Sequence, residues 1–105
     1  MRFLNYKPEK YKMVFKGHQY FHEINYNIKF DENRNEFVCE TVTIPGDLEY
    51  GKIVNGIISA KYPQDKMQAI INNYLIDPNE EHTKEFQDMQ EWRSFAKEYA
   101  KNIKN

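Results

Sequence analysis

Residues 36–62, EFVCETVTIPGDLEYGKIVNGIISAKY, contain the change in hydrophobic pattern that decides the fold. Before Pro45-Gly46 the apolar residues alternate with a period of two, whereas after it they recur every three or four residues. A period of two is typical of a strand with one face on a core, and a period near 3.6 is typical of an amphipathic helix. The sequence therefore predicts a small antiparallel β-sheet followed by helices, an α+β fold.

The predicted strands lie on the amino-terminal side of this change. Alternation over 19–30 and the β-branched run 36–44, joined by a polar turn, predict a β-hairpin over about 19–44. Residues 12–16 (KMVFK) can add a third strand, and two strands alone are only marginally stable. Residues 1–11 are expected to be an irregular arm or a short edge strand. Unbroken alternation places these side chains on one face of the first hairpin strand: Tyr20, His22, Ile24, Tyr26, Ile28 and Phe30.

Three helices are predicted on the carboxyl-terminal side, over about 48–61, 64–75 and 78–103. Asp47 and Asp77 are the expected caps of the first and third helices. The stripe predicted to face inward on the first helix comprises Ile53, Val54, Ile57, Ile58 and Tyr62. The corresponding stripe on the second helix comprises Met67, Ile70, Ile71, Tyr74 and Leu75.

Length and composition favour a single domain, 1–105, because the chain has 105 residues and no linker-like segment. The net charge is -1, which gives no global signal for nucleic acid or an anionic membrane. Only one cysteine is present, so no internal disulfide can form. No apolar run reaches the length of a signal peptide or membrane span, so we expect a cytoplasmic protein, or a virion component made there.

The sequence contains no recognisable catalytic motif. His18 and His22 are four residues apart in a predicted strand, which separates them by roughly 13 Å, too far for one metal ion. Cys39 lies in the middle of a predicted strand and is expected to be a small core residue rather than a nucleophile. The four glycines are dispersed and form no phosphate-binding loop. We therefore expect no catalytic residues, no cofactor and no metal, and a protein that is not an enzyme.

Protein binding is the function that the sequence favours. Large aromatic residues dominate binding energy at protein interfaces, and a domain this small is not expected to bury all of its own. The partner can be another protein or a second copy of the chain. The candidate contact residues are Tyr6, Tyr11, Trp92, Phe95 and Tyr99.

A nucleic-acid-binding or regulatory module is the alternative. The first sixteen residues carry five basic side chains against one acid, and the helix pair 48–75 has the outline of a helix-turn-helix. The helix pair offers few cations for phosphate contacts, which makes this the weaker hypothesis. The residues that would carry it are Lys7, Lys10, Lys12 and Lys66.

Three segments together resemble small uncharacterised proteins of bacterial phages and prophages, especially from gut bacteria. They are YNIKFDENRNEFVCETVT (26–43), KIVNGIISAKYPQDKMQAIINNYL (52–75) and EFQDMQEWRSFAKEYAK (85–101). The resemblance lies in the general sequence pattern and the order of the segments across most of 24–101. No functional residue can be carried over from it. It implies a virion, tail or assembly-related role, or a role in host interaction.

Overall fold

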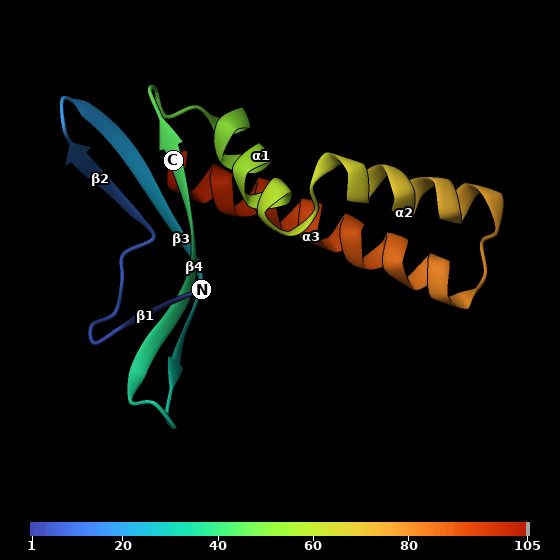
Figure 1. Ribbon diagram of the computed structural model, residues 1–105, viewed down its shortest axis with the longest axis horizontal. Coiled ribbons are helices and arrows are strands. Elements are labelled where there is room, and N and C mark those ends of the chain that lie inside the picture. The colour runs from blue at the N-terminus through green and yellow to red at the C-terminus, as the bar shows by residue number, and fades with distance from the viewer. Residues whose placement is uncertain (105) are drawn as a thin grey trace. The chain divides into compact units, whose positions relative to one another are not determined.

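The computed structural model describes residues 1–104 and confirms the α+β class (Figure 1). A four-stranded antiparallel sheet is followed by three helices. The chain forms two compact units, one covering Met1–Lys52 and the other beginning at Ile53. The first unit contains the sheet and the first turn of the first helix, and the second contains the remaining helical residues.

The sheet has four strands, which include the short edge strand expected as one alternative for 1–11. Its strands are β1 (Arg2–Leu4), β2 (Tyr11–Lys16), β3 (Gln19–Asp31) and β4 (Glu36–Pro45), in the spatial order β1-β4-β3-β2. The β3–β4 hairpin and the strand at β2 lie where the alternation predicts them. Part of the expected arm, 1–11, forms β1, which pairs antiparallel with β4 at one edge of the sheet.

A β-bulge in β3 changes which of its side chains share a face. Between Tyr26 and Lys29 the register against β4 shifts by one residue. Asn27, within this segment, has a φ of 53°, in the left-handed region that Asn tolerates better than most residues. The extra residue reverses the alternation beyond it, so Phe30 lies on the face opposite Ile24. The prediction of one common face was wrong for Phe30, because a sequence pattern does not reveal an inserted residue.

The two faces of the sheet differ in chemistry. One face carries His22 and Ile24 of β3 opposite Ile44 and its neighbours on β4, and all three named side chains are buried. The other face carries polar side chains near its centre, including the buried Asn25 of β3 and its cross-strand partner Thr41 of β4. The sheet is therefore apolar on one side and holds a polar cluster on the other.

The helices are α1 (Tyr50–Lys61), α2 (Gln64–Ile76) and α3 (Glu80–Lys104). Pro63 separates the first two, as the sequence predicts. Figure 1 shows α2 and α3 running side by side. None of the helices within residues 1–104 has the combination of length and apolar character needed to cross a bilayer. The inward stripe predicted for α1 is confirmed by the burial of Ile53, Val54, Ile57, Ile58 and Tyr62.

Two helix starts differ from the prediction by two residues. The cap of α3 is Asn79 rather than Asp77, because the Asn79 Oδ1 atom accepts a hydrogen bond from the backbone N–H of His82 at 2.7 Å. Asp47 does not directly precede α1, which begins at Tyr50. Asp and Asn both cap helices well, so sequence preference alone does not choose between neighbouring positions.

The helical unit has its own apolar core between α2 and α3. Tyr62, Ile70 and Met89 are buried there, with partly buried residues such as Phe86 packed against them. The rings of Tyr74 and Phe86 stack with their centroids 4.4 Å apart. The prediction for Leu75 was wrong: this side chain is 71% exposed, since it lies at the end of α2, beyond the apolar stripe.

Candidate functional site

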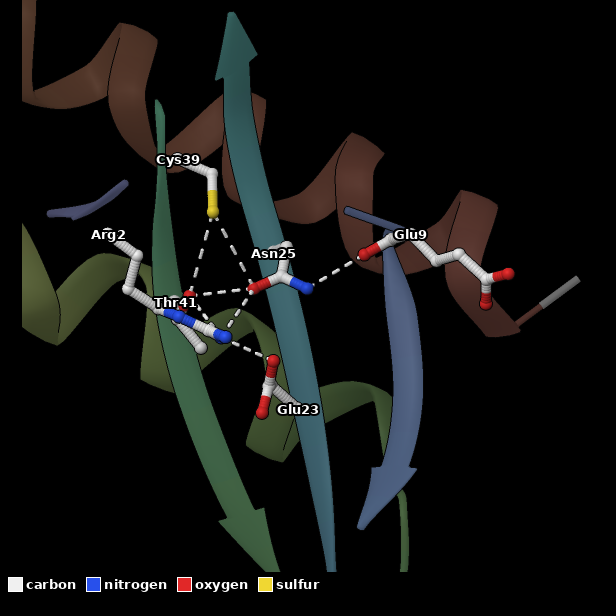
Figure 2. A network of polar contacts seen from close by, with 6 residues as sticks. All are labelled: Arg2, Glu9, Glu23, Asn25, Cys39 and Thr41. Atoms are coloured by element: carbon white, nitrogen blue, oxygen red, sulfur yellow. Dashed lines mark hydrogen bonds and ion pairs between the residues drawn. The ribbon is translucent and has the colours of Figure 1, made fainter. Parts of the chain in front are cut away.

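The polar face of the sheet is organised around Asn25, as Figure 2 shows. The Asn25 Oδ1 atom accepts a hydrogen bond from the Thr41 hydroxyl at 2.7 Å. The Cys39 thiol and the Arg2 guanidinium approach the same oxygen at 3.8 Å and 3.5 Å. Residues from β1, β3 and β4 therefore meet at one buried amide, which joins three strands across the sheet.

Asn25 also holds the segment that joins β1 to β2. Its side-chain Nδ2 atom donates to the carbonyl oxygen of Glu9 at 2.8 Å, and its backbone N–H donates to the carbonyl oxygen of Lys10 at 2.9 Å. Pro8 in this segment is buried. The loop is thereby attached to the centre of the sheet at successive residues.

Arg2 and Glu23 form an ion pair within this network. The hydrogen bond to the Glu23 carboxylate raises the pKa of the Arg2 guanidinium, against the opposing effect of burial. The cation of Arg2 is therefore already neutralised by an acid of the same face. A recess of about 270 Å³ lies above the pair, lined by Arg2, Tyr6, Lys7, Pro8, Lys12 and Glu23 among others.

The side chains of the network are bonded mainly to one another and to the backbone of the sheet. Cys39 is buried, which confirms its prediction as a core residue, and its sulfur contacts an amide and a hydroxyl rather than a base. His22 lies on the opposite face, where its Nδ1 and Nε2 atoms contact the Tyr11 hydroxyl and the Gly46 carbonyl oxygen. Within residues 1–104, no group of three or more His, Cys, Asp or Glu side chains is placed to hold a metal ion.

A cluster of exposed apolar side chains lies at the β2–β3 hairpin. Met13 and Phe15 of β2 and Tyr20 of β3 are 54%, 59% and 59% exposed. The register places Phe15 directly opposite Tyr20, with ring centroids 4.8 Å apart, and Met13 opposite His22. These three residues, here called the hairpin cluster, therefore share one face of two adjacent strands. A shallow depression of about 700 Å³ borders it, lined by Met13, Tyr20, His22, Pro45, Gly46 and Asp47 among others.

The predicted partner-binding residues are divided between the two units, with Tyr6 and Tyr11 in the first and three aromatic residues of α3 in the second. Tyr6 is exposed and lines the recess beside Arg2. Tyr11 is half-buried, and its hydroxyl forms a hydrogen bond with the His22 Nδ1 atom. The other three, on α3, form a run of ring contacts in which Trp92 meets Phe95 and Phe95 meets Tyr99. The Trp92 indole N–H also donates to the backbone carbonyl oxygen of Ile57 at 3.1 Å, and the Lys61 ammonium lies 4.6 Å from the indole ring centroid. Trp92 thus has partners inside its own unit.

The four lysines of the nucleic-acid hypothesis are also divided. Lys7 and Lys12 line the recess beside Arg2, and Lys10 lies in the loop between them. Lys66 belongs to the helical unit, where its ammonium lies 5.2 Å from the Tyr62 ring centroid. The amino-terminal lysines are therefore local neighbours, and the acids Glu9 and Glu23 line the same recess.

Sequence reasoning missed the hairpin cluster and the exposed end of α2, Leu75 and Ile76. The last two are 71% and 83% exposed. The available signal was that Met13 and Phe15 occupy one face of a short, lysine-flanked strand, which is typical of a sheet edge. Exposure itself depends on strand order, which the sequence pattern does not contain.

The chain matches no protein-family model, no curated protein and no solved structure in the comparisons made with known proteins.

Proposed function

We propose that this chain is a non-enzymatic protein-binding module and that the hairpin cluster forms its contact surface. The observation that carries the proposal is the exposure of more than half of Met13, Phe15 and Tyr20 on one face of adjacent strands. Aromatic residues and Met are enriched in the cores of interfaces, where they serve as anchors. Met also adapts its shape to the surface that it meets.

The cluster alone provides a limited binding energy. Burying the exposed part of each side chain contributes about 1 kcal/mol, so the three together contribute about 3 kcal/mol before the cost of association. A specific partner must therefore add hydrogen bonds or charge contacts to this apolar anchor. The hairpin cluster is best interpreted as the centre of an interface whose rim is polar.

The setting that we propose is a phage or prophage structure or its assembly. Support comes from the resemblance of 26–43, 52–75 and 85–101 to small phage and prophage proteins. In such a setting a small domain acts as an accessory that attaches to a larger protein. The aromatic residues Trp92, Phe95 and Tyr99 on α3, which are half-buried, would then mainly stabilise the helical unit.

Site-specific photo-crosslinking in the cells of origin tests the proposal. The photoreactive residue p-benzoylphenylalanine replaces Phe15 in one variant and Phe30 in a matched control, since Phe30 is also an exposed strand residue, 49% exposed, on the face opposite Ile24. We expect a discrete protein adduct from position 15 and none from position 30, with mass spectrometry identifying the partner. Equal adducts at both positions, or adducts only at position 30, would contradict the assignment of the surface.

A further inference from the structure

The free edge of β2 is the feature of the binding surface that most constrains a partner. In the spatial order β1-β4-β3-β2, the last strand pairs only with β3 among the described residues. The Asn25 N–H donates to the Lys10 carbonyl oxygen at 2.9 Å, and the register pairs Tyr11 with Ile24. In an antiparallel pair, hydrogen-bonded and non-hydrogen-bonded positions alternate. The N–H and C=O groups of Tyr11, Met13 and Phe15 therefore face outward, away from β3.

The two faces of β2 give this edge a distinct chemistry. Tyr11, Met13 and Phe15 lie on one face, and Lys12 and Lys16 lie on the other and are exposed. No acidic residue occurs in β2, and Lys10 directly precedes it. A strand that paired with this edge would therefore meet Tyr11, Met13 and Phe15 on one face. On the other face it would meet Lys12 and Lys16 with Val14 between them, and the acid opposite Lys12, Glu23, lies one strand further away on β3.

A second copy of the chain is a poor occupant of this edge. Pairing two β2 strands through their outward groups places both sets of lysines on the same face of the combined sheet. Like charges that lie opposite or next to each other across strands are destabilising. Lysines on an exposed edge are also a common device that prevents edge-to-edge association of identical sheets.

We propose that the partner adds an extended segment to β2 as a fifth strand, and that this segment alternates acidic and apolar residues. The inference rests on the proposed function and specifies the partner's chemistry. Main-chain hydrogen bonds to Tyr11, Met13 and Phe15 supply affinity, as in other cases of strand addition. The acidic side chains of the segment face Lys12 and Lys16, and its apolar side chains pack on the hairpin cluster. Electrostatic complementarity then selects this strand over neutral or basic ones.

A titration of the full chain with short capped peptides tests strand addition. The first peptide alternates Glu and Val, the second alternates Lys and Val, and the third contains Glu and Val with the alternation broken. We expect the first peptide alone to bind, with chemical-shift changes and slowed amide exchange at Tyr11, Met13 and Phe15. Absence of binding, equal binding of all three peptides, or changes confined to other residues would overturn the proposal.

N-methylation of the Glu-Val peptide tests the main-chain pairing without altering the protein. Two series of peptides carry methyl groups on alternate backbone nitrogens. In one series the methylated nitrogens are those that face β2, and in the other series they are those that face away from β2. We expect one N-methylated series to lose binding and the other to retain it. Equal affinities of the two series would overturn strand addition even where the peptide binds.

Charge reversal at the edge tests the choice of an acidic partner. The double variant Lys12→Glu with Lys16→Glu should weaken binding of the Glu-Val peptide about tenfold, since two exposed charge contacts are reversed. The matched control, Lys97→Glu with Lys101→Glu on α3, changes the net charge equally and should leave the affinity unchanged. Equal losses in the two double variants would overturn the role of Lys12 and Lys16.

The two proposals fail in different ways. Protein adducts from position 15 combined with no peptide binding would refute strand addition and retain protein binding through the hairpin cluster. A mass that doubles with concentration, with slowed exchange at Met13 and Phe15 in the absence of peptide, would overturn the acidic occupant in favour of self-association.

Discussion

Replacing Asn25 by Leu should destabilise the sheet more than replacing any other polar residue on the same face of the sheet. The Asn25 side chain makes hydrogen bonds with the Glu9 carbonyl oxygen at 2.8 Å and the Thr41 hydroxyl at 2.7 Å. Each bond contributes about 1 kcal/mol net, and a partly buried hydroxyl left without its acceptor costs about 1 kcal/mol more. We therefore expect Asn25→Leu to lower the free energy of unfolding of the sheet by about 3 kcal/mol.

The matched variant Thr41→Val removes only one of these bonds. The Asn25 Oδ1 atom keeps its contact with Arg2, so we expect a loss of about 1 kcal/mol. In the double variant the hydroxyl that Asn25→Leu would leave unsatisfied is absent. Both single variants also lose the same Asn25–Thr41 bond, which the double variant loses only once. The cost of the double variant should therefore be about 2 kcal/mol less than the sum of the two single variants.

Native-state hydrogen exchange is the assay that isolates the sheet. Trp92 belongs to the second unit, so its fluorescence follows the helices rather than the sheet. A loss of about 3 kcal/mol should accelerate exchange of the β3 and β4 amides more than a hundredfold where exchange requires unfolding of the sheet. A loss under about 0.5 kcal/mol, or acceleration confined to α2 and α3, would refute the assignment of Asn25 as the central polar contact.

The remaining predictions concern pH, a helix contact and the bulge. Burial raises the pKa of Tyr26 and Tyr62 above 10.0, so their contribution to stability is complete below pH 10.0 and is lost as the pH rises through the folded-state values. Denaturant unfolding of the native chain and of the variants Tyr26→Phe and Tyr62→Phe across that pH range checks this loss of stability, which should be smaller in each variant. Trp92→Phe removes the donor to Ile57 and should cost the helical unit about 1 kcal/mol by thermal unfolding. Asn27→Val places a β-branched residue at positive φ and should cost about 2 kcal/mol in the same assay, whereas Asn27→Gly should cost much less.

Much of the fold could be predicted because hydrophobic period is a local property. The alternation that ends near Pro45 and the three-four spacing that follows locate β2, β3, β4 and the helices to within about two residues. The strand β1 has three residues, too few to show a pattern, and it exists through pairing with β4. The bulge at Asn27 likewise depends on how two strands align.

The candidate site was less accessible from sequence. Aromatic residues such as Trp92 were predicted as contact residues because of their size, and the structure gives Trp92 a hydrogen bond and ring contacts within its own unit. Exposure of Phe15 and Tyr20 follows from the position of β2 at the end of the sheet, which is set by strand order.

The sequence by itself determined the kinds of element and their order along the chain, since backbone preference and side-chain period act between near neighbours. Only the tertiary structure decided which strands lie at the edges of the sheet, which amide lies at the centre of the polar face, and which apolar side chains stay exposed to water. Those properties depend on pairing between residues far apart in the chain, such as Asn25 with Glu9 and Thr41. Such pairings depend on the energy of the whole arrangement, and no local pattern records them.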